Sequence, residues 1–361
     1  MFYVGLMSGT SLDGVDAVLA DFESGKPRLI ADAYLAFDAA LRLELLALNS
    51  PGENEIDRAA RVGNELARNY AAAVSAVLAG SKTPASSVRA IGCHGQTIRH
   101  RPERGYTTQI GNAALLAELT GIRVVADFRS REVAAGGQGA PLAPAFHAAL
   151  FADPAEDRVT INLGGIANLT FLNSDGNVSG FDSGPGNCLL DLWASRHLGT
   201  PHDAGGSWAA GGQAIAGLLE RMLQEPYFAA APPKSTGRDL FNENWLRGKL
   251  RGGEDPQAVQ ATLLELTARS LANALARHGA GARRIIVCGG GAKNDALMRR
   301  LAELAAPAAL ETSDRHGIDP QLVEAAAFAW LAKRALEGQA GNLPSVTGAR
   351  GARVLGAIYP A

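Results

Sequence analysis

Apolar and small polar residues follow one another at the start of the chain in a pattern typical of a β-hairpin. The run FYVGLM (residues 2–7) predicts one strand, and VDAVLADF (residues 15–22) predicts a second. Glycine, serine and threonine lie between them and break the strand pattern. A simple hairpin needs only a couple of turn residues, whereas this connection also carries Asp13, with Asp16 just beyond it. Such a density of amides, hydroxyls and carboxylates suits a loop that binds phosphate and a metal ion.

The order of predicted elements in the first half of the chain recurs in the second half. After its hairpin, the first half continues through a strand and a helix to a strand that ends in CHGQT (residues 93–97), and then a helix and a strand. The second half opens with VTINLGGIANLTFL (residues 159–172), again strand, glycine turn and strand. It later reaches a strand that ends in CGGGAKN (residues 288–294). This repetition indicates a duplication.

Helical periodicity completes the prediction of the fold class. Leu264, Ala268, Leu271 and Leu275 follow one another at helical spacing and form one apolar face. Hairpins followed by alternating helices and strands predict a mixed sheet flanked by helices in each half. Glycine and proline punctuate GGQGAPLAPAF (residues 136–146), which suits a linker. We therefore predict an α/β protein with two domains, residues 1–140 and 141–361, and a cleft between them.

Charge and cysteine content exclude several classes of protein. The formal net charge of the 361-residue chain is -2, and no long Lys/Arg block is present, which argues against nucleic acid or a membrane surface as partner. No apolar run approaches the roughly 18 residues of a membrane span, and no basic region precedes the first apolar run, so a secretory signal is not expected. The three cysteines lie far apart, without metal-ligand spacing. We expect a soluble cytoplasmic protein.

Three glycine-rich turns are candidates for a nucleotide site. They are SGTSLDG (residues 8–14), NLGGIAN (residues 162–168) and CGGGAKN, and each follows a predicted strand, where α/β proteins bind ligands. One Gly-Gly pair is more often a structural turn alone, but three turns at matched places favour phosphate binding by the hairpins and close approach of a purine and ribose at the third. Lys234-Ser235-Thr236 resembles the end of a P-loop but lacks the glycines before it.

Stretches across nearly the whole chain resemble those of a known family. They are GLMSGTSLDGVDA, IGCHGQTIRHRP, TTQIGNAALLAELTGIRVVADFRSREVAAGGQGAPLAP, NLGGIANLT, GFDSGPGN, PKSTGRDLFN, CGGGAKN and NLPSVTGA. The chain resembles the actin, hexokinase and heat-shock chaperone ATPase superfamily and, more narrowly, the anhydro-N-acetylmuramic acid kinase family. The resemblance implies two ribonuclease-H-like domains around ATP, Mg²⁺ as a cofactor and a homodimer. In the wider superfamily the first phosphate loop usually leads with an acid, whereas Asp13 follows Ser8, Gly9 and Thr10 here.

The turns and the resemblance together assign the nucleotide contacts. The expected ATP-binding residues are Gly9, Thr10, Ser11, Leu12, Asp13, Gly14, Val15, Asp16, Gly164, Gly165, Asn168, Gly289, Gly290, Gly291 and Asn294. Asp13 is also the candidate Mg²⁺ contact, directly or through water.

Asp182, in GFDSGPGN, is the candidate catalytic residue. An isolated aspartate ahead of a helix is often only a cap, but the resemblance places the family's catalytic base here. The implied substrate is a sugar whose C1 and O6 are joined as an internal acetal. Asp182 would take a proton from water as it attacks C1, like the base of an inverting glycosidase, while the departing O6 attacks the γ-phosphate of ATP. The expected products are N-acetylmuramic acid 6-phosphate and ADP, an activity that belongs to cell-wall recycling.

Candidate sugar contacts lie in both halves of the chain. Arg131 could pair with a carboxylate of the sugar, although an exposed surface arginine is as common. Gln96 and Thr97 end a predicted strand and offer hydrogen bonds, whereas the neighbouring His94 is more typical of a structural hydrogen-bonding residue. Glu324 lies on an apolar helix stripe, in what the pattern predicts to be the second turn of its helix, so it should be paired or functional.

Two other functions remain open at this point. An ordinary amino-sugar kinase of the same superfamily would use Asp182 to deprotonate a hydroxyl and would accept the open-ring sugar. An actin-like ATPase that uses the nucleotide as a switch would turn over ATP without any sugar.

Overall fold

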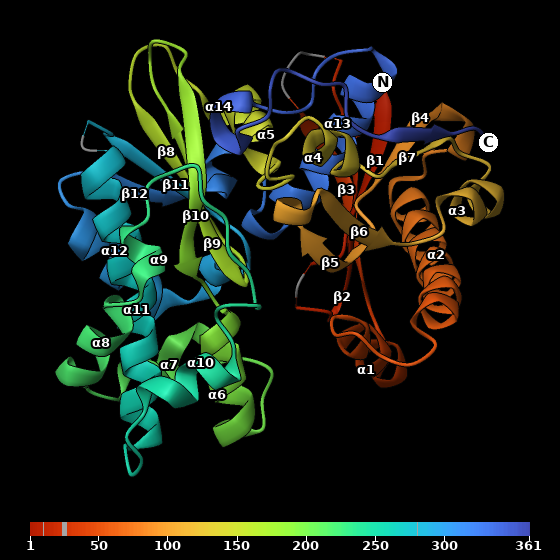
Figure 1. The fold of residues 1–361 in the computed structure, drawn as a ribbon. Helices are drawn as coiled ribbons and strands as arrows, with labels where there is room; N and C mark the ends of the chain where they lie inside the picture. The colour runs from red at the N-terminus through yellow and green to blue at the C-terminus, as the bar shows by residue number, and fades with distance from the viewer. Residues whose placement is uncertain (10, 24–26, 280) are drawn as a thin grey trace. The chain divides into compact units, whose positions relative to one another are not determined.

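The computed structural model describes residues 1–9, 11–23, 27–279 and 281–361, and the chain forms two compact units (Figure 1). Unit 1 comprises Met1–Leu150 together with Leu322–Ala361, and unit 2 comprises Phe151–Gln321. Of the expected site residues, Thr10 lies outside the described part of the chain. No helix of the described residues combines the length and apolar character needed to cross a bilayer.

Unit 1 is built on a six-stranded mixed sheet with the order β13-β7-β4-β1-β2-β3. Its strands are β1 Phe2–Met7, β2 Gly14–Asp21, β3 Arg28–Ala36, β4 Val88–Cys93, β7 Val124–Ala126 and β13 Ala357–Tyr359. Strands β1, β2 and β3 are antiparallel neighbours, while β4 runs parallel to β1 and β7 parallel to β4. The predicted N-terminal hairpin is therefore confirmed.

Helices cover both faces of this sheet. They are α1 Ala39–Leu48, α2 Glu55–Ser81, α3 Ala113–Thr120, α4 Ser130–Ala134, α13 Val323–Leu336 and α14 Pro344–Thr347, with α5 Ala143–Phe151 ending at the border of the unit and a two-stranded ribbon of β5 Gln96–Arg101 and β6 Tyr106–Ile110. Val4 and Leu6 pack in one core cluster with Leu66 of α2. Successive strand residues point to opposite faces, and on the other face a Cβ on Gly5 would overlap the main chain of α13.

Unit 2 repeats this topology. Its five-stranded sheet has the order β10-β9-β8-β11-β12, with β8 Arg158–Leu163, β9 Ile166–Leu172, β10 Val178–Pro185, β11 Arg284–Cys288 and β12 Ala309–Thr312. Again three antiparallel strands come first, and then two strands that run parallel to the first one. Both sheets therefore share the ribonuclease-H-like strand order, which confirms the predicted repeat and the predicted fold class.

Unit 2 has its own core beneath its longest helix, α11. The helices are α6 Cys188–Leu198, α7 Ser207–Ala210, α8 Ala216–Leu223, α9 Pro226–Ala229, α10 Glu243–Lys249, α11 Pro256–His278 and α12 Asp295–Ala305. The predicted apolar face of α11 is buried, and Leu271 lies in one cluster with Leu169 and Phe171 of the sheet. Asp255 caps the start of this helix, because its side chain accepts from Ala258 N at 2.9 Å.

The compact units differ from the division that the sequence suggests. We expect a break near residue 140 and a continuous second domain to residue 361, but Leu322–Ala361 belongs to unit 1. The physical reason is that α13 lies on β1 and β4, and that β13 pairs with β7. Only glycine at positions 5 and 92 lets the helix backbone approach the sheet this closely, since a Cβ at either position would overlap a carbonyl of α13.

Candidate active site

The first glycine-rich turn, between β1 and β2, is anchored by Ser8. This side chain is 1% exposed, and its hydroxyl donates to Gly95 O at 3.1 Å. Because that bond uses the only hydroxyl proton of Ser8, the phenol of Tyr70, 2.7 Å away, donates to Ser8 Oγ. The turn is thus tied both to α2 and to the loop that follows β4.

His94 and Gln96, which follow β4, make two further contacts that position this turn. His94 Nδ1 lies 3.3 Å from Ser8 O, and His94 Nε2 lies 3.0 Å from Arg129 Nη2. Burial and the Arg129 charge lower the pKa of His94 to about 3, so the ring is neutral, donates at Nδ1 and accepts at Nε2. Gln96 Nε2 donates to Gly9 O at 3.1 Å. His94 is therefore a structural residue.

Gln96 and Thr97 differ in what they can offer a sugar. Gln96 is 1% exposed, and its Oε1 has no hydrogen-bond partner among the described residues. Its amide already holds the first turn, so its main contact is with the protein. Thr97 is half-buried on β5 and lies 3.2 Å from the Gln109 amide, which donates to its hydroxyl.

The rest of the first turn divides into exposed and buried residues. Ser11 Oγ donates to Asp13 Oδ1 at 2.6 Å, and both side chains are exposed. Leu12 and Val15 instead place their side chains in the core, so only their main chain is available to a ligand. Gly14 is buried at the start of β2, and Asp16 is half-buried on the same strand.

In unit 2, the second turn is bonded to the start of α6. Gly164 O accepts from Asn187 N at 2.9 Å, and Gly165 O accepts from Gly186 N and Cys188 N, both at 3.0 Å. These carbonyls therefore satisfy amides at the helix N-terminus that have no partner within the helix.

The third turn mixes constrained positions with an open one. Gly289 has a φ of 85° and donates its N–H to Pro320 O at 2.7 Å. A Cβ on Gly291 would lie 2.7 Å from Leu163 Cβ, whereas a Cβ on Gly290 would have no atom within 4 Å. Asn294 caps α12, because its side chain accepts from Leu297 N at 3.0 Å. Gly290 is thus the position of this turn whose side is open to a ligand.

Asp182 lies in a row of polar residues that crosses the sheet of unit 2. On neighbouring strands, Asn162 is paired with Asn168, and Asn168 with Asp182. These side chains lie on the face opposite the core residues Leu169 and Phe181. Asp182 is 7% exposed, and Asn168 Oδ1 has no hydrogen-bond partner among the described residues. The strand pairing therefore brings together Asp182 and Asn168, which the sequence names as separate site residues.

Helix α9 and the segment that follows it hold Asp182 in place. Thr236 N donates to Asp182 Oδ2 at 3.1 Å, and Asp182 N donates to Lys234 O at 3.3 Å. The Tyr227 hydroxyl donates to Asp182 O at 2.7 Å. Burial and the nearby Asp182 and Asp239 charges raise the pKa of Tyr227 far above its usual value, so the phenol stays protonated. The sequence does not identify these contacts or Asn162 as part of the site. The stretch PKSTGRDLFN, which resembles the family, is the one signal that points to this segment.

The remaining sugar candidates lie in unit 1. Arg131 is exposed on α4. Its neighbour Glu132, which the sequence did not single out, is fully buried and accepts from Gly139 N at 2.6 Å. Glu324 is half-buried and lies in the first turn of α13, not the second, because a 3-10 turn at Pro320–Leu322 precedes the helix.

Asp13 and Ser11 offer the exposed oxygens of the first turn to a metal ion. No group of three or more His, Cys, Asp or Glu among the described residues has the arrangement of a metal site. A dedicated cage is not required for Mg²⁺ in kinases, which commonly bind it through one or two carboxylates and the substrate phosphates. One exposed carboxylate beside a hydroxyl fits that mode of binding.

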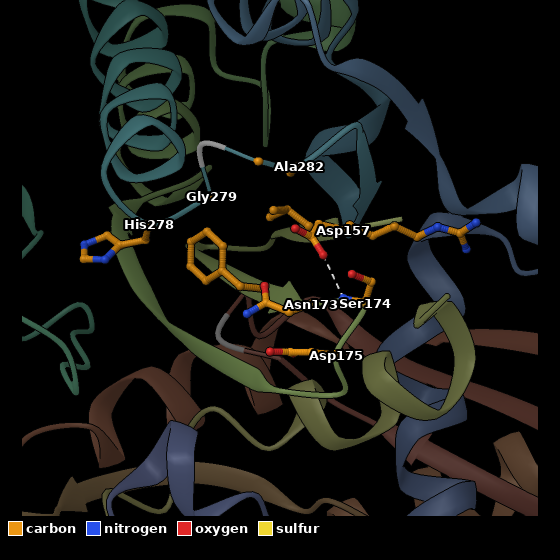
Figure 2. Close-up of a pocket in the computed structure, with 11 residues that line it drawn as sticks. Asp157, Asn173, Ser174, Asp175, His278, Gly279 and Ala282 are labelled. Carbon is orange, nitrogen blue, oxygen red and sulfur yellow. Dashed lines mark hydrogen bonds between the residues drawn. The ribbon is translucent and has the colours of Figure 1, made fainter. Parts of the chain in front are cut away.

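A cavity of about 310 Å³ lies at the other end of the unit 2 sheet (Figure 2). It is lined by the first residues of β8, the turn after β9 and the end of α11, and Asp157 accepts there from Ser174 N at 2.7 Å. The second and third glycine-rich turns lie at the opposite end of this sheet, after Leu163 of β8 and Cys288 of β11. This cavity is therefore separate from the candidate active site.

Two ribonuclease-H-like units, with glycine-rich turns after matching strands and a buried aspartate beside one of them, have the fold of the actin-like ATPase class. The comparison of the whole chain with family models is more specific. The chain belongs to the anhydro-N-acetylmuramic acid kinase family, whose model matches residues 1–361.

Relatives named anhydro-N-acetylmuramic acid kinase match along their full length. That of Variovorax paradoxus (strain S110) is 58% identical, covering 99% of each chain, and that of Nitrosospira multiformis is 54% identical, covering 100% of this chain and 99% of its own. Among solved structures, the activator of the 2-hydroxyisocaproyl-CoA dehydratase from Clostridium difficile is 14% identical with a TM-score of 0.48 and covers 93% of this chain and 97% of its own.

Proposed function

We propose that this protein is an ATP-dependent kinase that opens 1,6-anhydro-N-acetylmuramic acid with water and phosphorylates O6. The products are N-acetylmuramic acid 6-phosphate and ADP. Membership of the family over all 361 residues carries this proposal, and the buried, three-way anchored Asp182 supports its chemistry.

Asp182 acts as the general base of the reaction. It takes a proton from water as the water oxygen bonds to C1 of the sugar, and the C1–O6 bond breaks. The released O6 attacks the γ-phosphorus of ATP, and ADP leaves. An inverting glycosidase needs a second carboxylic acid to protonate the leaving oxygen, whereas here the phosphoryl group takes the place of that proton.

The glycine-rich turns bind the nucleotide. Main-chain amides of the turns at Gly9 and Gly164 contact the phosphates, and the open side of Gly290 lies against the purine or ribose. Phosphoryl transfer depends mainly on positioning and charge stabilisation. Mg²⁺ supplies charge neutralisation on the phosphates when bound, and Asp13 with Ser11 would hold it in this chain.

Sugar recognition falls to residues of unit 1. The exposed guanidinium of Arg131 suits a two-pronged contact with the lactyl carboxylate of the sugar. Thr97 and Glu324, both half-buried, suit hydroxyl or amide groups. Gln96 contributes less to sugar binding than these residues, because its amide donates to Gly9 O.

The test is a reaction with ATP, Mg²⁺ and the anhydro sugar in ¹⁸O-labelled water, read by mass spectrometry. Label at C1 of a 6-phosphorylated product, lost in Asp182→Asn, is the expected result. Phosphorylation of the open-ring sugar alone, without uptake of solvent oxygen, would instead show an ordinary amino-sugar kinase. ATP turnover that does not depend on sugar would point to a nucleotide switch.

The proposal also includes a homodimer in the cytoplasm, and sedimentation of the purified protein tests its assembly.

A further inference from the structure

A small pocket lies behind the strand that carries Asp182. It has a volume of about 100 Å³ and is lined by Phe181 and Ser183 of β10, by the segment from α8 to Lys234, and by the last turns of α11. Phe181 and Ser183 flank Asp182 in the strand and point to the other face of the sheet. The pocket is therefore distinct from the polar row to which Asp182 belongs.

Two cationic side chains, Lys234 and Arg277, line this pocket beside His278, and no aspartate or glutamate is among the described residues that do so. Burial and the two cations lower the pKa of His278. Lys234 Nζ donates to Tyr227 O at 3.0 Å and lies 4.6 Å from the centre of the Tyr227 ring. Arg277 donates to Phe228 O at 3.3 Å. Neither Lys234 nor Arg277 forms an ion pair with any described residue.

A cation at the C-terminus of a helix is favoured by the helix dipole, which accounts for Arg277 by itself. It does not account for Lys234, which lies on another segment and is half-buried. Burial and the Arg277 charge lower the pKa of Lys234, while the Asp182 charge opposes this. An ammonium group with three protons and one acceptor, next to a guanidinium, has unused donors that an anion would satisfy.

The size of the pocket limits the anion. Its volume of about 100 Å³ equals that of roughly three water molecules in the liquid, at about 30 Å³ each. This holds one phosphate-sized group but not a sugar. We propose that this pocket binds inorganic phosphate, or an oxyanion of the same shape, between Lys234 and Arg277.

This assignment gives a role to the Lys234-Ser235-Thr236 motif, which lacks the glycines of a P-loop. The main chain of the motif holds Asp182 through Lys234 O and Thr236 N, while the side chain of Lys234 lies at the pocket. One short segment therefore connects a bound anion on one face of β10 with the carboxylate on the other.

His278 provides a local readout for phosphate binding. The full-length protein, saturated with ADP and Mg²⁺, is labelled with ¹³C-histidine and titrated with inorganic phosphate at constant pH and ionic strength. The resonance of His278 among the seven histidines is assigned from the spectrum of His278→Gln. We expect a saturable shift in the low millimolar range, whereas glucose 6-phosphate, which is too large, should leave the resonance in place.

Arg277→Gln should weaken phosphate binding about tenfold or more, as expected for the loss of one charge-assisted hydrogen bond. Arg299→Gln, an exposed arginine of α12 outside the pocket, is the matched control and should bind as the wild type does. A His278 shift that does not saturate, or that is the same in Arg277→Gln, would overturn the proposal. Because the readout is binding at His278, it is independent of kinase activity.

Discussion

The main-chain N–H of Thr236 donates to Oδ2 of Asp182 across 54 residues of sequence. This bond orients a carboxylate on an edge strand, where the neighbouring strand Ile166–Leu172 lies on one side only. Hydrogen bonds of this kind hold a catalytic group in one rotamer, which lowers the entropic cost of reaching the reactive geometry. The segment at Lys234–Thr236 is thereby part of the machinery that positions the proposed base.

Replacing Asp182 with asparagine should abolish the base and keep the scaffold. The amide oxygen of asparagine can still accept from Thr236 N, so the thermal unfolding temperature should stay close to that of the wild type. The kcat should fall by about 10²–10⁴-fold, the usual contribution of a general base. Phosphorylated sugar measured by mass spectrometry gives the rate, and a variant with near wild-type turnover would remove Asp182 from this role.

Gly290 and Gly291 form a matched pair for testing the third turn. Gly290→Ala meets no protein atom within 4 Å, so stability should be unchanged, while the KM for ATP should rise about tenfold, or about 1.4 kcal/mol. Gly291→Ala would place its Cβ 2.7 Å from Leu163 Cβ and should lower the free energy of unfolding by about 1–3 kcal/mol. Unchanged ATP kinetics in the stable Gly290→Ala variant would speak against a nucleotide contact here.

Tyr70→Phe tests the anchor of the first turn. It removes the phenol that donates to Ser8 Oγ at 2.7 Å, in a fully buried site, while Ser8 still donates to Gly95 O. We expect a loss of about 1 kcal/mol in the free energy of unfolding, measured by urea denaturation. Tyr106→Phe, at a tyrosine that is 40% exposed, is the control and should change stability by less than about 0.5 kcal/mol.

His94 should make unit 1 sensitive to acid. Its pKa is lowered from 6.5 to about 3 in the folded protein, so below pH 6.5 the unfolded chain binds a proton that the folded chain does not. Stability should therefore be complete above pH 6.5 and fall as the pH drops from there toward 3, by up to about 1.4 kcal/mol per pH unit.

Urea denaturation at several pH values measures this dependence. His94→Gln should flatten the acid side of the stability profile relative to the wild type, whereas His202→Gln, at an exposed histidine, should retain the wild-type slope. Equal slopes in all three proteins would mean that His94 titrates alike in the folded and unfolded chains.

The local patterns of the sequence predicted elements well but not their partners. The apolar stripe of α11 follows from residue spacing, and its burial was expected. A stripe on α13 is just as visible in the sequence, but it does not say which sheet the helix covers, and the helix crosses back to β1 and β4. Periodicity reports one face of an element, whereas the choice of partner depends on contacts distant in the chain.

The candidate site shows the same limit. Gln96, which the sequence places at the end of a strand as a ligand contact, is the first residue of β5 in the structure, and its amide reaches Gly9 O, 87 residues away. In β10, the register shifts between Asp182 and Gly184, and only the folded sheet shows that Asp182 stands opposite Asn168. Predicting the polar row from Asn162 to Asp182 therefore requires the pairing of the strands as well as the sequence motifs.

The return of Leu322–Ala361 to unit 1 also affects how the protein folds during its synthesis on the ribosome. Phe151–Gln321 is contiguous, so it can fold as soon as it leaves the exit tunnel. The sheet of the other unit must wait, because α13 and the edge strand Ala357–Tyr359 follow Phe151–Gln321 in the chain. Until α13 has been synthesised, the nascent chain exposes the face of β1 and β4 that this helix covers, and this apolar surface is what a chaperone would recognise.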